Sequence, residues 1–244
     1  MGEIQENGGR GGGRNPYLLP AVIVLGIIGL AGALAWRVSG MARQSAMEEA
    51  REAASQMVSI EKLIAKNPAP RDPSTITKDT VTYVLDASSM EKWVHFSFGK
   101  LTVFTAGNTA ADSLEWDAAF RRAKILTNGG ASGKLGKGEV TIAVGAKFDE
   151  VKTPPSMGWA KDVATENITE NMNPALDKWY QYNFWTHKLK PRDEVYVLKT
   201  ADGKFVKLQI MDYYCGKASG CYTIKFAFIG DGPGALPDAP RNTD

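Results

Sequence analysis

Two histidines, His95 and His187, are the side chains in this chain best suited to metal or cofactor chemistry. Each lies two residues after a tryptophan, His95 after Trp93 and His187 after Trp185. Paired imidazoles bind haem iron when apolar rings cover the macrocycle, so a bis-histidine haem site would need both residues. We favour a simpler interpretation, in which a partly buried strand histidine and a loop histidine make ordinary hydrogen bonds.

A dense group of aromatic residues falls just before His187. Its members are Trp179, Tyr180, Tyr182, Phe184 and Trp185. Such a group can form part of a core, a ligand slot or a protein interface. Packing in the core is the commonest role of a single ring, but five rings in so short a segment rarely all point inward. We therefore expect some of them to be exposed or to lie at an interface.

The two cysteines, Cys215 and Cys221, are separated by five residues. This spacing differs from the C-x2-C pattern of zinc sites, and no histidine lies nearby, so we expect no metal site. Their flanks have the alternation of two hairpin strands. We predict a disulfide across the hairpin, which would place the domain in an oxidising compartment, and the alternative is two free thiols.

Signatures of catalysis and of nucleic-acid binding are missing from the sequence. The glycine- and lysine-rich segment 129–138 lacks the spacing of a phosphate-binding loop, and neither G-x-S-x-G nor H-E-x-x-H occurs. Two histidines leave few ways to assemble a catalytic triad. The net charge is only +2, and no basic run exceeds two residues. We predict a protein that is not an enzyme and does not bind nucleic acid.

A run of twenty uncharged residues, from Tyr17 to Trp36, lies between Arg14 and Arg37. As a helix it would just cross a hydrocarbon core of about 30 Å, which predicts a transmembrane helix over residues 16–37. Ala33-Leu34-Ala35 resembles a signal-peptidase site, so a removable signal peptide is the alternative. The run is longer than the apolar region of a usual signal peptide, which favours an uncleaved signal-anchor.

Small residues recur along this predicted membrane helix, at Gly26, Gly29, Gly32 and Ala33. They would allow another helix to approach closely, which suggests a partner in the membrane. Glycine and alanine are also common in transmembrane helices, so the pattern has an equally good neutral explanation.

The rest of the chain divides by composition. Residues 1–15 are rich in glycine and predict a disordered tail, and residues 38–66 predict a juxtamembrane helix. Prolines in 67–79 predict a linker, and residues 231–244 predict an irregular tail.

Alternating apolar and polar residues dominate the segment 80–230 and predict β-strands. In residues 93–98, Val94, Phe96 and Phe98 should face the core while Trp93 and His95 face the other side. Asn128-Gly129-Gly130 and Ala201-Asp202-Gly203 are hairpin-turn signals, and 221–228 alternates again. We expect a mainly β fold, an antiparallel sandwich or a barrel-like domain.

Several segments in this region together resemble the HmuY family. They are residues 115–122, 127–130, 193–210 and the pair Tyr213-Tyr214, in this order and spacing. The resemblance spans about residues 80–230. It implies an all-β fold in the bacterial cell envelope, and the best-known members of the family are haem-binding lipoproteins that serve iron uptake.

Two functional hypotheses follow. The first is a non-catalytic accessory or scaffold subunit of a larger membrane complex, such as a respiratory or photosynthetic electron-transfer complex. The protein would be a single-pass protein of the bacterial inner membrane with a periplasmic C-terminal domain. Its partners would be an integral membrane protein complex and the lipid bilayer, with no cofactor. The alternative is a haem- or tetrapyrrole-binding protein of the HmuY type.

Overall fold

The computed structural model describes residues 18–73, 78–104, 110–166 and 170–230, with side chains from residue 34 onward. The predicted tails 1–15 and 231–244 lie outside these ranges. So do the side chains of Gly26, Gly29, Gly32 and Ala33, on which the prediction of a membrane partner depends.

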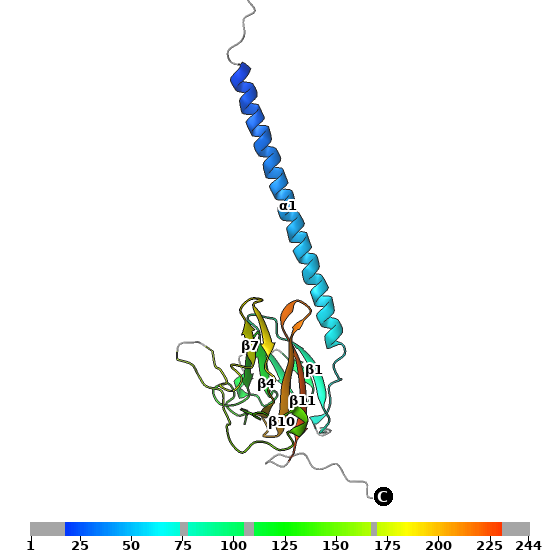
Figure 1. Cartoon of the computed structure of the whole chain (residues 1–244), viewed down its shortest axis with the longest axis vertical. Coiled ribbons are helices and arrows are strands. Elements are labelled where there is room, and N and C mark those ends of the chain that lie inside the picture. Colours follow the sequence, from blue (N-terminus) through cyan, green and yellow to red (C-terminus); the bar gives the residue numbers. More distant parts are fainter. Residues whose placement is uncertain (1–17, 74–77, 105–109, 167–169, 231–244) are drawn as a thin grey trace, which may run out of the picture. The chain divides into compact units, whose positions relative to one another are not determined.

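Antiparallel sheets form the β-domain, as the alternation predicts (Figure 1). A five-stranded sheet has the order β1-β11-β10-β9-β6, a four-stranded sheet has the order β3-β2-β4-β5, and β7 pairs with β8 in a separate hairpin. The strands are β1 (Val81–Asp86), β2 (Val94–Ser97), β3 (Thr102–Phe104), β4 (Ala118–Arg121), β5 (Lys124–Thr127), β6 (Glu139–Ile142), β7 (Tyr180–Asn183), β8 (Lys188–Pro191), β9 (Tyr196–Lys199), β10 (Phe205–Cys215) and β11 (Ala218–Ile229). Short 3-10 helices, η2 (Ala110–Asp112) and η3 (Phe148–Glu150), lie in the connections.

The main core contains the apolar faces that the alternation identifies. Phe96 and Phe98 from the β2 region pack with Phe226 of β11, with ring centroids between 4.9 and 5.9 Å apart. The remaining alternating residues of β11, Tyr222, Ile224 and Phe228, join the same cluster. The predictions of strands and inward faces in this region are therefore confirmed.

Two smaller clusters cover other parts of the sheets. Phe148 of η3 and Trp159 pack over Val197 and Phe205 of the five-stranded sheet. Trp116, Ala119 and Leu126 form the second cluster, with Trp93 and Phe104 against it. Alternation alone would assign the outer face of each sheet to solvent. In both sheets, one of these two clusters covers part of that face.

The predicted hairpin at Asn128-Gly129-Gly130 is wrong. The preceding strand β5 belongs to the four-stranded sheet, whereas the following strand β6 belongs to the five-stranded sheet, so the two do not pair. The loop instead folds around Asn128, whose Nδ2 donates hydrogen bonds to the carbonyls of Ser113 and Trp116 at 2.7 and 2.8 Å. Gly136 permits this approach, because a Cβ there would lie 2.0 Å from the Asn128 carbonyl oxygen.

One helix, α1 (Leu18–Ile64), covers both the predicted membrane span and the predicted juxtamembrane helix. The chain divides into two compact units, Met1–Ala54 and Ser55–Asp244, and the boundary falls within this helix. Among the described residues, no helix combines the length and apolar character needed to cross a membrane. The transmembrane segment predicted over residues 16–37 is therefore not supported by the structure.

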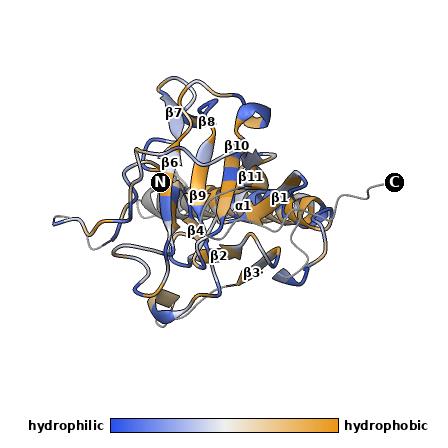
Figure 2. Ribbon diagram, turned by 90° about the horizontal axis from the view of Figure 1, so that it is seen from below, coloured by the Kyte–Doolittle hydropathy of each residue, from blue (hydrophilic) through white to orange (hydrophobic). Residues whose placement is uncertain are grey.

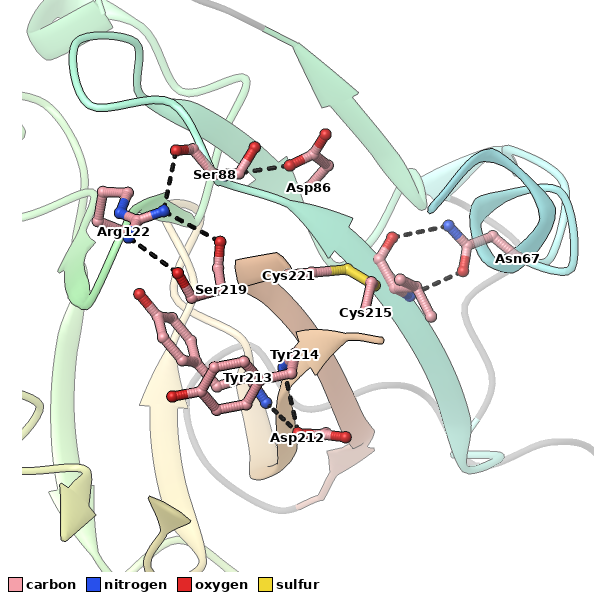
Figure 3. Close-up of a disulfide and its surroundings, with 11 residues drawn as sticks. Asn67, Asp86, Ser88, Arg122, Asp212, Tyr213, Tyr214, Cys215, Ser219 and Cys221 are labelled. Atoms are coloured by element: carbon pink, nitrogen blue, oxygen red, sulfur yellow. Dashed lines mark hydrogen bonds between the residues drawn. A yellow bond between two sulfur atoms is a disulfide. The ribbon is translucent and has the colours of Figure 1, made fainter. Parts of the chain in front are cut away.

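The last turns of α1 pack on the β-domain within the second unit. The predicted disulfide between Cys215 and Cys221 is confirmed, with a Cα–Cα distance of 5.5 Å (Figure 3). It forms an apolar cluster with Ile60 and Leu63. Asn67 then donates to the Val84 carbonyl at 2.8 Å and accepts from the Val84 N–H at 2.7 Å. Its amide thereby occupies backbone groups on the outer edge of β1, which would otherwise be open to pairing with another strand.

Candidate functional site

The hairpin of β7 and β8 carries one of the two histidines at its tip. Its register places Asn183 opposite Lys188, so Phe184 to His187 form the connecting turn. Asn183 organises this turn, because its Oδ1 accepts hydrogen bonds from the N–H groups of Trp185 and Thr186 at 2.9 and 3.0 Å. Asparagine is favoured at such positions since its short side chain can mimic a backbone acceptor.

Aromatic rings around this turn are exposed. Tyr182, Phe184 and Trp185 are 53%, 71% and 89% exposed, respectively. The Phe184 ring centroid lies 6.0 Å from that of Trp185 and 6.1 Å from that of His187. Three rings and an imidazole therefore share one small apolar surface, which we call the hairpin tip (Tyr182, Phe184, Trp185 and His187).

His187 is held by a hydrogen bond between its Nδ1 and the Tyr182 hydroxyl. The backbone of His187 has φ of 53°, a left-handed conformation that costs free energy in a residue other than glycine. When Nδ1 carries the proton and donates it to the tyrosine oxygen, Nε2 has a lone pair directed away from that bond. Histidines that bind metals are usually oriented in this way through their other nitrogen.

The base of the hairpin is anchored in the domain. Trp179 is fully buried, and its Nε1 donates to the Ala123 carbonyl at 2.9 Å. Tyr180 is partly buried and packs edge-on against Trp179 with centroids 5.0 Å apart. The Leu189 N–H of β8 donates to the Tyr214 hydroxyl of β10 at 2.8 Å. The predicted aromatic cluster therefore divides into a buried base and an exposed tip.

His95 has very different surroundings. It lies on β2, is only 6% exposed, and its ring is 4.8 Å from that of Trp116 and 5.6 Å from that of Phe104. Burial lowers the pKa of His95 from 6.5 to about 4, so its imidazole is neutral near pH 7. These contacts give His95 the structural environment of a core histidine.

The structure does not bring the two histidines together. In Figure 2, the β7–β8 hairpin lies at the upper edge of the view, whereas β2, which carries His95, lies below its centre. His95 packs with Phe104 and Trp116, whereas His187 packs with Tyr182 and Phe184, so these contacts give no support to a bis-histidine site within one chain.

The Trp116-Asp117 pair, the centre of the family-like motif, has a structural role. Both carboxylate oxygens of Asp117 accept backbone hydrogen bonds at 2.9 Å, one from Phe98 and one from Ala201. These donors come from the end of β2 and from the turn between β9 and β10, so one side chain joins the two sheets. Burial raises the pKa of Asp117 to about 6 despite these hydrogen bonds.

Sequence inspection did not single out the link between Tyr182 and His187, or the role of Tyr214. The first could have been recognised from the hairpin register, because Tyr182 pairs with Leu189 and position 187 is then its diagonal neighbour. The second depends on a contact between β8 and β10, which are distant in sequence. No local pattern contains that information.

Comparison with solved structures identifies similar folds. A chain described as a lipoprotein of Bacteroides fragilis has a TM-score of 0.53 at 20% identity, covering 67% of this chain and 96% of its own length. A chain described as an HmuY-like haem-binding protein of Bacteroides vulgatus has a TM-score of 0.50 at 20% identity, covering 66% and 97%. At this identity the similarity establishes the fold. No curated protein matches the chain significantly.

The HmuY protein family model matches residues 89–227, which is more than half of the 244 residues. This match contains both sheets except β1 and the end of β11, together with the Trp116-Asp117 pair and the whole β7–β8 hairpin. The chain belongs to the HmuY family.

Proposed function

We propose that the β-domain binds haem or a related tetrapyrrole at the hairpin tip. The observation that carries the proposal is the exposed group of Phe184 and Trp185 beside His187, whose Nδ1 is held by Tyr182. An exposed apolar surface of this kind usually marks a binding site. A planar macrocycle would cover the rings, and the imidazole would reach its iron.

Each residue of the tip has a distinct part in this proposal. His187 would supply Nε2 as an axial ligand, since Nδ1 is already engaged by Tyr182. Trp185 and Phe184 would stack against the macrocycle and remove apolar surface from water. Residues 120–123, after the Trp116-Asp117 motif, contain no histidine or methionine. His187 would therefore be the axial ligand that one chain contributes.

Family membership supports this proposal over the other functional hypothesis. One structure of similar fold is described as an HmuY-like haem-binding protein, and the match extends over nearly all of that chain. The proposed activity is binding rather than catalysis.

The test is a titration of the full-length protein in mild detergent with haemin, followed by the Soret absorbance. We expect a saturable shift in the parent protein and a loss of at least tenfold in affinity for His187→Ala. The iron-free ligand protoporphyrin IX separates the contribution of iron ligation by His187 from that of ring stacking by Trp185. Trp185→Ala should weaken binding of both ligands, whereas His187→Ala should weaken mainly haemin.

His95→Gln is the matched control, because it changes the other histidine and leaves the hairpin tip intact. Haemin binding should be unchanged in this variant. The proposal is contradicted if the parent shows no Soret shift, or if His187→Ala and His95→Gln bind haemin equally.

A second candidate remains the accessory subunit of a bacterial inner-membrane complex, with the β-domain in the periplasm. The observation in its favour is a series of exposed apolar side chains on the described part of α1. They are Leu34, Trp36, Val38, Met41 and Met47. Apolar side chains in such number favour lipid or another protein as a neighbour. If the protein extracted from native membranes migrates alone on a native gel, this candidate fails.

A further inference from the structure

A basic cavity lies at the end of the five-stranded sheet where β10 begins and β11 ends. Its volume is about 280 Å³, and three lysines line it, Lys78, Lys152 and Lys207. The remaining lining residues are Thr153, Phe228, Ile229 and Gly230. These residues come from distant parts of the sequence, so the fold rather than a local charge run brings the lysines to one cavity.

Lys207 is the most unusual of the three, since its side chain is buried in the sheet. The residue is 5% exposed, and its Nζ donates a hydrogen bond to the Phe148 carbonyl at 2.8 Å. The same Nζ lies 4.5 Å from the centroid of the Phe148 ring, and Lys225 Nζ lies 4.2 Å from that centroid. An ammonium group has three donors, so one hydrogen bond and one ring leave capacity for another acceptor.

The charges around Lys207 are mainly positive. After burial, the largest influence on its pKa is Lys152, which lowers it, and Lys225 lowers it further. Asp149 is the acidic group that acts in the opposite direction. Lys78 reaches the cavity from another side, because a Cβ built on the lining residue Gly230 would lie 2.8 Å from its Nζ. Bringing like charges together costs free energy that a bound anion would recover.

We propose that this cavity binds a small dianion of the phosphate type, held by Lys78, Lys152 and Lys207. Thr153 adds a hydroxyl donor, and Phe228 and Ile229 form an apolar wall. A phosphate group free in solution and one carried by a small organic molecule share the chemistry that these residues recognise. Charge-assisted hydrogen bonds to the ammonium groups would supply most of the affinity.

This site is separate from the hairpin tip and does not depend on the proposed haem binding. Lys207 pairs with Val197 and Ala227 near the start of β10, whereas Tyr214, which supports the hairpin, pairs with Ser219 near its end. Seven residues of extended strand correspond to about 23 Å. Failure of one proposal therefore leaves the other untouched.

The test is calorimetric titration of the full-length protein with inorganic phosphate at pH 7.5, with ionic strength held constant by sodium chloride. Glycerol 3-phosphate serves as the organic phosphate, and succinate shows whether a dicarboxylate is also accepted. We expect saturable binding of phosphate with one site per chain. Lys207→Met and Lys152→Met should each weaken it about tenfold, the loss of one charge-assisted contact.

Lys92→Met is the matched control, because it removes an exposed lysine that does not line the cavity and should leave the affinity unchanged. Lys152 lies on an exposed loop, so Lys152→Met keeps the test valid if Lys207→Met does not fold. At the same phosphate concentration, the unfolding midpoint should rise more in the parent than in the cavity variants. Absence of saturable phosphate binding, or equal affinity in Lys152→Met and Lys92→Met, would overturn the proposal.

Discussion

Two regions of this β-domain contain the same residue types, a tryptophan and a histidine, in opposite surroundings. Trp116 and His95 pack against each other with centroids 4.8 Å apart, and both are almost fully buried. Trp185 and His187 lie together at the hairpin tip, where Trp185 is 89% exposed. The buried pair stabilises the fold, whereas the exposed pair is free to contact a ligand.

The polar atoms of the two regions differ in their contacts, and this difference distinguishes a structural role from a binding role. Trp116 Nε1 donates to the Ala110 carbonyl at 2.7 Å, so the buried ring has its donor satisfied within the domain. At the tip, the hydrogen bond between His187 Nδ1 and the Tyr182 hydroxyl orients the imidazole without burying it. A histidine beside a tryptophan is therefore no evidence for a cofactor site until exposure is known.

The largest difference between the regions should appear in stability. Trp116→Ala removes a fully packed ring and should lower the free energy of unfolding by about 3–5 kcal/mol. Trp185→Ala removes an exposed ring and should change it by less than about 0.5 kcal/mol. Urea unfolding of the two full-length variants measures both values. Equal losses would mean that the tip belongs to the cooperative core.

The pH dependence of stability should distinguish the buried region through two opposing groups. The pKa of His95 falls from 6.5 to about 4 on folding, so its contribution to stability is present above pH 6.5 and is lost as pH falls toward 4. The pKa of Asp117 rises from 3.8 to about 6, so its contribution is present below pH 3.8 and is lost as pH rises through 6. Each shift corresponds to about 3 kcal/mol at most.

Because these effects oppose each other between pH 4 and 6.5, they should partly cancel in the parent protein. His95→Gln should therefore lose less stability on acidification than the parent, and Asp117→Asn should lose more. Unfolding free energies at several pH values test this, with His187→Gln as the exposed control. Parallel pH profiles in all four proteins would show that neither buried group titrates as described.

The disulfide joins β10 and β11 close to Tyr214, which contacts the β7–β8 hairpin (Figure 3). Its removal therefore tests whether the crosslink only stabilises the domain or also positions the hairpin tip. Replacing Cys215 and Cys221 together by alanine should cost about 2 kcal/mol, as expected for a short closed loop. Thermal or urea unfolding of the double variant measures the loss. Haemin affinity should remain unchanged, and a parallel loss of binding would mean that the tip is positioned through the crosslink.

The smallest expected effect concerns the link between hairpin and sheet. Tyr214→Phe removes the acceptor for the Leu189 N–H and should cost about 1 kcal/mol. If that contact positions the tip, haemin affinity should also fall, whereas Tyr213→Phe, at the neighbouring position, should leave it unchanged. Identical affinities in the two variants would indicate that the β7–β8 hairpin holds its own geometry.

Much of the fold could be predicted because side-chain alternation is local. Phe96 and Phe98 point inward as their spacing predicts, and so do Tyr222 and Phe226. The Cys215–Cys221 disulfide was predictable for the same reason, since both residues lie on adjacent strands of a hairpin. By contrast, Asn128-Gly129-Gly130 resembles a hairpin turn but connects different sheets, because its partner contacts lie elsewhere in the chain.

The candidate sites were less accessible from sequence. The aromatic group 179–185 was recognisable by its density, but its division at Tyr182 into buried and exposed parts depends on packing against β10 and the Ala123 carbonyl. Lys207 was not distinguishable from any other strand lysine. Its burial follows from η3, which lies about sixty residues earlier and covers that face of the sheet.

The sequence by itself therefore determined the family, the mainly β architecture, the inward faces of the strands and the disulfide, since these depend on the order and spacing of neighbouring residues. Only the tertiary structure decided that His95 is buried, that His187 is exposed, and that three lysines share one cavity. Those properties depend on which distant segments cover a given face. Burial controls whether a side chain stabilises the fold or remains available for binding.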